Sequence, residues 1–146
     1  MEIVAIPESL TVHTADGVRI DAGHLPGGDD LCFVLAHGFT CSWRKPALLR
    51  IADVLNRQGG VIGLDFRGHG RSGGHSTVGD REVLDIDAVV AAARQRGYER
   101  IVVAGFSMGG AVAINSIAQI PEIDGLIALS AYSSFADLFA DQMLRM

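Results

Sequence analysis

The 146-residue sequence is poor in cysteine, in clustered basic residues and in long apolar runs. Its two cysteines, Cys32 and Cys41, are not spaced like metal ligands, so we expect buried free thiols, which suit a reducing compartment. The 12 lysines and arginines are scattered and are outnumbered by 17 acidic residues, which gives a net charge of −5. Nucleic acids and anionic membrane surfaces need a clustered positive face, so we expect neither as a partner.

No apolar stretch reaches the roughly 18 residues of a membrane span. The N-terminal MEIVAIPESL has neither the basic start nor the long apolar run of a signal peptide, so we expect a cytoplasmic protein. Apolar residues, by contrast, make up 49% of the chain, and there are 18 glycines. This composition excludes a disordered chain and predicts one globular domain with many tight turns.

The pattern of apolar residues changes after residue 25, from alternating residues to short unbroken runs. Leu10 to Thr14 and Val18 to Leu25 flank Asp16-Gly17 and predict an antiparallel hairpin. Four short apolar runs then predict buried strands at 31–36, 61–64, 101–104 and 126–129. Between them, helices are predicted from Pro46 to before Gly59, from Asp80 to Arg96 and from Met108 to Ile120. We predict an α/β fold: an open, mostly parallel sheet of about six strands, with the hairpin first and helices on both faces.

One short motif carries chemistry by its own residues. Gly105-Phe106-Ser107-Met108-Gly109 follows the third buried strand and opens the third helix. A serine on such a sharp bend is strained, and the glycines two residues to either side remove collisions that side chains would cause. The Ser107 hydroxyl would then project at a helix N-terminus, where main-chain amides favour a developing oxyanion. The pattern therefore predicts a nucleophilic serine.

Two further motifs carry a resemblance. His37-Gly38-Phe39-Thr40 follows the first buried strand, and DFRGHGRS (65–72) follows the second. With GFSMGG (105–110), these segments resemble three motifs of the α/β-hydrolase family, in order and along almost the whole chain. The resemblance implies a sheet order of 1-2-4-3-5-6, Ser107 as the nucleophile, and an oxyanion hole made by the amides of Phe39 and Met108. It also implies an esterase or acyl hydrolase. The sequence itself has no metal-ligand cluster or nucleotide-binding loop, so we expect no cofactor.

The sequence departs from that family after the sixth strand. Members continue through further strands, an acid and a histidine that serves as the base, whereas every histidine here precedes Ser107. We therefore expect residues 1–146 to form a single, truncated α/β-hydrolase-like domain without those strands, acid and histidine. His37 and His69 are expected to scaffold their loops through bonds to backbone, and Asp65 to tie its own loop together. The other histidines, His13, His24 and His75, are expected at the surface.

Two functions remain open at this stage. The first is a serine hydrolase of small ester or acyl substrates, incomplete as this chain alone; Phe39, Trp43 and Met108 would favour an uncharged acyl group. The second is a non-catalytic interaction module or fragment that pairs through the edge strand Gly125 to Tyr132, as a homodimer or with a complementing chain. Ser134 and Asp137 predict the start of a last helix, and Asp141 lies further along it.

Overall fold

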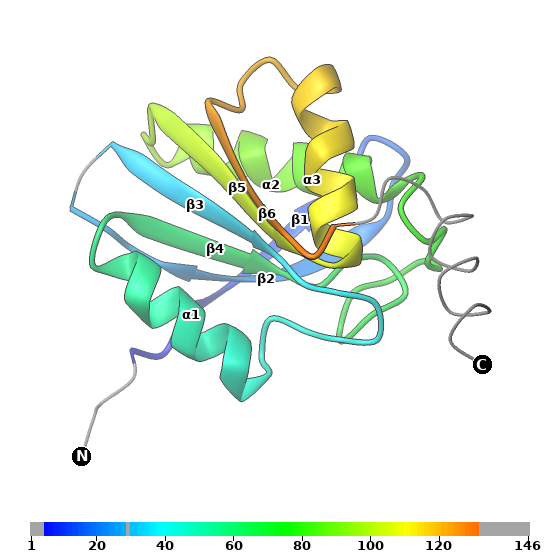
Figure 1. Cartoon of the computed structure of the whole chain (residues 1–146), viewed down its shortest axis with the longest axis horizontal. Helices are drawn as coiled ribbons and strands as arrows, with labels where there is room; N and C mark the ends of the chain where they lie inside the picture. Colours follow the sequence, from blue (N-terminus) through cyan, green and yellow to red (C-terminus); the bar gives the residue numbers. More distant parts are fainter. Residues whose placement is uncertain (1–4, 29, 132–146) are drawn as a thin grey trace.

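The computed structural model describes residues 5–28 and 30–131. Within them it holds six strands and three helices (Figure 1). The strands are β1 (Glu8–His13), β2 (Arg19–Leu25), β3 (Leu31–Ala36), β4 (Gly60–Leu64), β5 (Arg100–Phe106) and β6 (Gly125–Leu129). The helices are α1 (Pro46–Asn56), α2 (Glu82–Gln95) and α3 (Met108–Gln119). Each predicted element up to the sixth strand is present. The positions predicted for Tyr132, Ser134, Asp137 and Asp141 lie outside the described residues.

The strands form one sheet in the order β1-β2-β4-β3-β5-β6. β1 pairs antiparallel with β2, and β2 pairs antiparallel with β4. The remaining neighbours, β4-β3, β3-β5 and β5-β6, are parallel, because a helix crosses between each pair of consecutive strands from β3 onward. Both the mostly parallel sheet with its N-terminal hairpin and the predicted strand order are confirmed.

Helices cover both faces of the sheet, as predicted (Figure 1). The side chains of β3 alternate between two cores: Cys32 and Val34 belong to the core that also holds residues of α2 and α3. Phe33 and Leu35 belong to the core that holds Leu48 of α1. Strands with both faces covered read as unbroken apolar runs, which explains why these segments showed no polar alternation.

The last strand is less buried than its apolar sequence predicted. β6 pairs with β5 alone among the described residues, so only one of its edges is satisfied there. Ile127 and Leu129 remain 40% and 52% exposed. On α3, Ile114 and Ile117 are also exposed. The prediction of a fully buried strand was therefore wrong in degree, although the strand itself is present.

The sheet order brings three loops to one edge. β4, β3 and β5 are neighbours and run parallel, so the segments after their carboxyl ends leave the same side of the sheet (Figure 1). The register pairs Ala36 with Gly105. The chain after β3 therefore leaves the sheet beside the chain after β5, which positions the loop at His37 next to the bend at Ser107.

Candidate active site

Ser107 lies on the bend between β5 and α3. Its backbone has φ 56° and ψ −118°, a conformation that non-glycine residues adopt rarely and at a cost of roughly 1–3 kcal/mol. Its amide donates to the carbonyl of Leu129 in β6 at 2.9 Å, and its carbonyl accepts from the amide of Ala111 in α3 at 3.1 Å. Neighbouring strand and helix thus hold the residue in its strained conformation, and its side chain is only half-buried.

The two glycines that flank the serine sit where a side chain would not fit. A Cβ atom on Gly105 would come 2.3 Å from the carbonyl oxygen of Gly109. A Cβ atom on Gly109 would come 2.3 Å from the carbonyl oxygen of Ala36 and 2.5 Å from that of His37. These are backbone atoms and cannot rotate away. The close packing of α3 against β3 and β5 therefore depends on both glycines.

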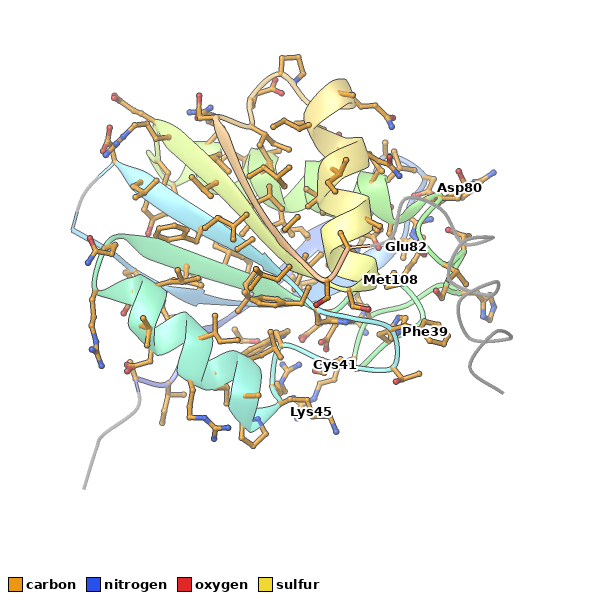
Figure 2. All side chains as sticks on the ribbon, viewed as in Figure 1. Phe39, Cys41, Lys45, Asp80, Glu82 and Met108 are labelled. Atoms are coloured by element: carbon orange, nitrogen blue, oxygen red, sulfur yellow. The ribbon has the colours of Figure 1, made fainter. Side chains whose placement is uncertain are left out.

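The loop after β3 lies against the serine. A Cβ atom on Gly38 would come 3.4 Å from the Ser107 Cβ and 3.9 Å from its Oγ. The next residue, Phe39, is half-exposed, whereas Met108 at the start of α3 is buried. Figure 2 shows Phe39 and Met108 at the same end of the sheet.

Two main-chain N–H groups on the segments around Ser107 have no acceptor among the residues that the structure describes. Within the described part of the chain, the Phe39 amide donates no hydrogen bond. The Met108 amide lies in the first turn of α3, where N–H groups have no partner within the helix. Unpaired amides can stabilise a negatively charged oxygen, and that of Met108 also lies at the positive end of the α3 dipole.

His37 and His69 are bonded to backbone groups, as expected. The Nε2 of His37 accepts from the amide of Phe66 at 3.0 Å, and the Nε2 of His69 accepts from the amide of Thr40 at 3.0 Å. Burial, above all, lowers the pKa of His37 below its ordinary value. Neither ring hydrogen-bonds the Ser107 hydroxyl. Both histidines therefore act as loop supports in this structure.

The three remaining histidines differ in exposure. His13 and His75 are exposed, as expected, but His24 is buried, so its prediction as a surface residue was wrong. Its ring nitrogen Nε2 lies 2.7 Å from the hydroxyl of Tyr98, and burial lowers its pKa. The physical reason is that Tyr98, just beyond α2, covers this part of β2 although it lies 74 residues away in sequence.

Asp65 supports loops rather than the serine, as the sequence predicted. Its carboxylate is fully buried and accepts from the Ser42 hydroxyl at 2.6 Å and from the Trp43 amide at 3.0 Å. It also accepts from the Arg71 amide at 3.0 Å and from the Arg44 guanidinium at 3.2 Å. One carboxylate thus joins the loop before α1 to its own loop.

A second buried network escaped the sequence reasoning. The guanidinium of Arg67 lies between Asp16 of the hairpin turn and Asp85 of α2, with nitrogen–oxygen distances of 2.8 Å to each. Asp85 also accepts from the Arg67 amide at 2.9 Å. The one available signal was the position of Asp85 and Glu82, which share the inward face of the helix with Val89. A charged residue on an apolar face indicates a buried partner but does not identify it.

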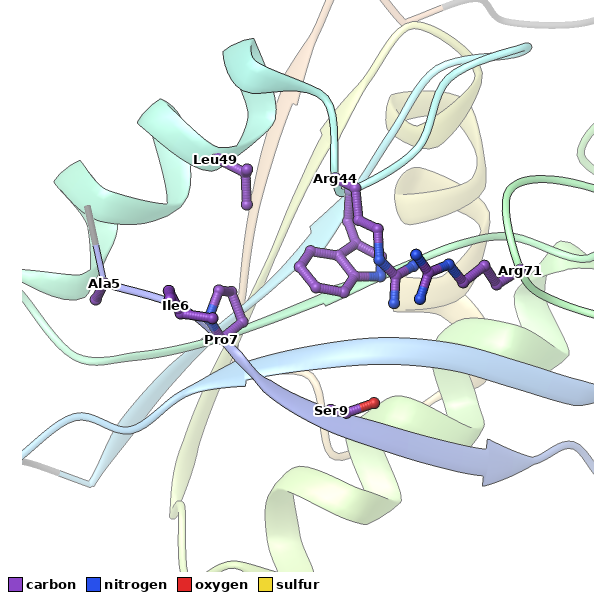
Figure 3. Close-up of a pocket in the computed structure, with 8 residues that line it drawn as sticks. Ala5, Ile6, Pro7, Ser9, Arg44, Leu49 and Arg71 are labelled. Atoms are coloured by element: carbon purple, nitrogen blue, oxygen red, sulfur yellow. The ribbon is translucent and has the colours of Figure 1, made fainter. Parts of the chain in front are cut away.

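Trp43 serves packing. Its ring lies against Gly23 and Gly63, whose missing side chains leave the space, and its Nε1 donates to Asp21 at 3.1 Å. A pocket of about 520 Å³ opens beside it, lined in part by Ile6, Arg44 and Arg71 (Figure 3). Ser107, Phe39 and Met108 do not line this pocket.

The two cysteines are unpaired. Cys32 is fully buried, and burial raises its pKa to about 12, whereas Cys41 is half-buried rather than buried as expected. Among the described residues, no group of three or more His, Cys, Asp or Glu side chains could hold a metal ion. In the same part of the chain, no helix is long and apolar enough to cross a membrane.

A family model described as Hydrolase_4, serine aminopeptidase S33, matches residues 29–145. The chain belongs to this family of α/β hydrolases. It is also similar to the esterase Pf2001 of Pyrococcus furiosus, with 32% identity and a TM-score of 0.89 over 95% of this chain and 57% of that one. Comparison with curated proteins gave no match.

Two further solved structures have the same fold. Est1E of Butyrivibrio proteoclasticus, solved with ferulic acid bound, is 27% identical, with a TM-score of 0.72 over 82% of this chain and 52% of that one. XC6422 of Xanthomonas campestris, described as an α/β serine hydrolase without a lid, is 23% identical, with a TM-score of 0.75 over 88% and 62%. This chain thus spans little more than half the length of the structures that it resembles.

Proposed function

We propose that this chain carries the nucleophile and oxyanion-binding part of a serine hydrolase that acts on carboxylic esters or related acyl substrates. Ser107 attacks the carbonyl carbon, and the amides of Phe39 and Met108 stabilise the oxyanion. The bond to the leaving group then breaks, the alcohol departs with the serine proton, and water hydrolyses the acyl-enzyme to the acid and the free serine. The observation that carries the proposal is the strained backbone of Ser107, with φ 56°, directly before α3 and against the Gly38 loop.

The relatives support the reaction class. Pf2001 is named an esterase, and Est1E was solved with ferulic acid. The family description names an aminopeptidase, which cleaves an amide rather than an ester. Both reactions begin with attack on a carbonyl carbon and pass through an oxyanion, so the same serine and amides serve either substrate. The exposed aromatic ring of Phe39 favours an apolar acyl group.

No general base for Ser107 lies among the described residues, because His37 and His69 are committed to backbone amides. In a serine triad, loss of the histidine lowers turnover by about a millionfold, while the oxyanion hole and binding still give roughly 10³–10⁴ over water. We therefore expect this chain alone to hydrolyse esters slowly and to react more visibly with an activated phosphonylating probe.

A fluorophosphonate probe tests the proposal. We expect slow labelling of Ser107, located by peptide mass spectrometry, and loss of that labelling in Ser107→Ala. Ser9→Ala is the matched control, since Ser9 is exposed on β1. Labelling that persists unchanged in Ser107→Ala, or a folded chain that is never labelled between pH 6 and 9, refutes the assignment.

Exposed apolar side chains favour a second candidate, a module that pairs through β6. Ile127 and Leu129 are exposed on this strand, beside an edge with one described partner, and Ile114 and Ile117 are exposed on α3. Light scattering should then show a mass that rises with concentration for the natural chain and falls back in Leu129→Lys. A constant monomer mass at all concentrations excludes self-pairing through this edge.

A further inference from the structure

The loops after β3 and β4 are joined by a reciprocal pair of hydrogen bonds. His37, at the start of the first loop, accepts the amide of Phe66 at the start of the second. His69, in the second loop, accepts the amide of Thr40 in the first. The two rings lie 5.1 Å apart between centroids. We call this arrangement, made by His37 and His69 with the amides of Phe66 and Thr40, the histidine clasp.

These bonds define the protonation state of both rings. An Nε2 atom that accepts an N–H carries a lone pair, so the ring proton must reside on Nδ1. In each ring Nδ1 has a carbonyl to which it can donate: Gly38 at 2.6 Å from His37, and Arg67 at 3.1 Å from His69. Both rings are therefore neutral Nδ1–H tautomers. A second proton, on Nε2, would remove the acceptor and abolish the clasp bond.

The clasp holds the segment that faces Ser107. Thr40 has φ 63°, which a β-branched residue adopts only when its surroundings impose it. The bond from its amide to His69 supplies that restraint, and the Phe39 ring packs edge-on against His69 with centroids 5.4 Å apart. His69 therefore contacts the ring of Phe39 and accepts from the amide of the next residue, Thr40. On the other side of Phe39, Gly38 lies against Ser107.

We propose that His69, together with His37, is a positioning residue for the oxyanion-binding loop, and that a second proton on the clasp releases this loop in mild acid. The catalytic consequence rests on the proposed function; the clasp itself does not. His69 acts through Thr40 on the orientation of the Phe39 amide, and it takes no part in the reaction of Ser107.

The charges around the clasp set the direction of its response to pH. Each ring faces the other, and the carboxylate of Asp65 also acts on His37. The guanidinium of Arg67 is directed away, to Asp16 and Asp85. Burial lowers the pKa of His37 most; the His69 ring adds to this, while the Gly38 carbonyl and Asp65 oppose it.

The sign of the stability change follows from this shift. The pKa of His37 in the folded chain lies below its value of about 6.5 in the unfolded chain. As the pH falls below 6.5, the unfolded chain binds the proton first, so the stabilisation from neutral His37 is lost. Above that pH the stabilisation is fully present. The two neighbouring rings also repel each other once both are charged, which favours separation of the loops.

Nuclear magnetic resonance of the natural chain with ¹⁵N-labelled histidine tests the clasp without any variant. At pH 7.5 we expect His37 and His69 as Nδ1–H tautomers. On acidification, the Thr40 and Phe66 amide signals should shift together with the two rings. A ring that is Nε2–H or doubly protonated at pH 7.5, or amide signals that stay constant while the rings titrate, overturns the proposal.

Variants then test the link to Ser107. His69→Gln replaces the ring by an amide whose oxygen can accept from Thr40 without titrating, whereas His69→Ala removes the acceptor. His75→Gln is the matched control, because His75 is exposed in the same connection between β4 and α2. We expect probe labelling of Ser107 at pH 7.5 to fall about tenfold or more in His69→Ala and to remain near the natural rate in His69→Gln and His75→Gln.

The dependence of Ser107 labelling on pH, measured from pH 7.5 into mild acid, distinguishes this inference from the proposed function. The loss of labelling in mild acid, relative to pH 7.5, should be smaller in His69→Gln than in the natural chain and unchanged in His75→Gln. Identical profiles in all three, with Ser107 labelled, refute the positioning role and leave the serine assignment standing. A chain with the expected tautomers but no labelling at any pH refutes the proposed function and leaves the clasp in place.

Discussion

Gly109→Ala is the substitution that most directly tests how the bend at Ser107 is built. The added Cβ atom would lie 2.3 Å from the Ala36 carbonyl oxygen and 2.5 Å from the His37 carbonyl oxygen. Ordinary contacts begin near 3.4 Å, so α3 must move away from the end of β3 by about 1 Å. No rotamer change can relieve the contact, because both oxygens belong to the backbone.

The expected loss of stability follows from two opposing effects. Overpacking against rigid atoms costs about 3 kcal/mol, and replacing glycine by alanine inside a helix returns about 1 kcal/mol. We therefore expect the free energy of unfolding to fall by about 2 kcal/mol. With a typical urea slope of about 1.5 kcal/mol per molar, the midpoint of unfolding should drop by about 1.3 M.

Urea unfolding, followed by circular dichroism, measures this change. Gly28→Ala is the control, since nothing in the described structure lies within 4 Å of its added Cβ atom and its φ is not positive. We expect that control to be neutral or slightly stabilising. A Gly109→Ala chain that is as stable as the natural one, or more stable, would show that α3 does not approach β3 as closely as the structure has it.

Two further predictions concern buried groups. Asp85→Asn removes the charge that faces buried Arg67, so the free energy of unfolding should fall by about 3 kcal/mol. The exposed pair of Asp53 and Arg57 provides the control, and Asp53→Asn should change stability by less than about 0.5 kcal/mol. A similar loss in both would refute a special role for the buried pair. Because Cys32 is fully buried and its pKa is raised to about 12, iodoacetamide should alkylate Cys41 first and Cys32 only after unfolding. Equal alkylation rates in the folded chain, measured by peptide mass spectrometry, would contradict this.

The fold was predictable because its determinants are local. The apolar run of β3 (Leu31–Ala36) and the glycine stop after α1 are each contained in a few neighbouring residues. The bend at Ser107 is local for the same reason, since its glycines stand two positions away on either side. The strand order came instead from the resemblance to the α/β hydrolases, since apolar periodicity does not fix which parallel strands become neighbours.

The contacts that sequence reasoning missed are long-range. His24 looked like a surface residue because a two-stranded hairpin has an exposed face, but Tyr98 covers it from 74 positions away. Arg67 reads as part of a glycine-rich loop, and its acidic partners lie 18 and 51 positions away. Such pairs become visible only when the strand order places their elements together.

The carbonyl and the amide of Ser107 are bonded to two elements, α3 and β6, and β6 is the more exposed of the two. The Ser107 carbonyl accepts from Ala111 within α3, but its amide donates to Leu129, the last residue of the half-exposed strand β6. The orientation of the serine therefore depends on β6. Among residues 5–28 and 30–131, the outer edge of this strand has no partner. A strand paired with β6 would also restrain the Leu129 carbonyl and, through its one hydrogen bond, the bend at Ser107. Because the Leu129 carbonyl ends the edge strand and accepts from Ser107, we predict that pairing through this edge raises the rate of probe labelling at Ser107.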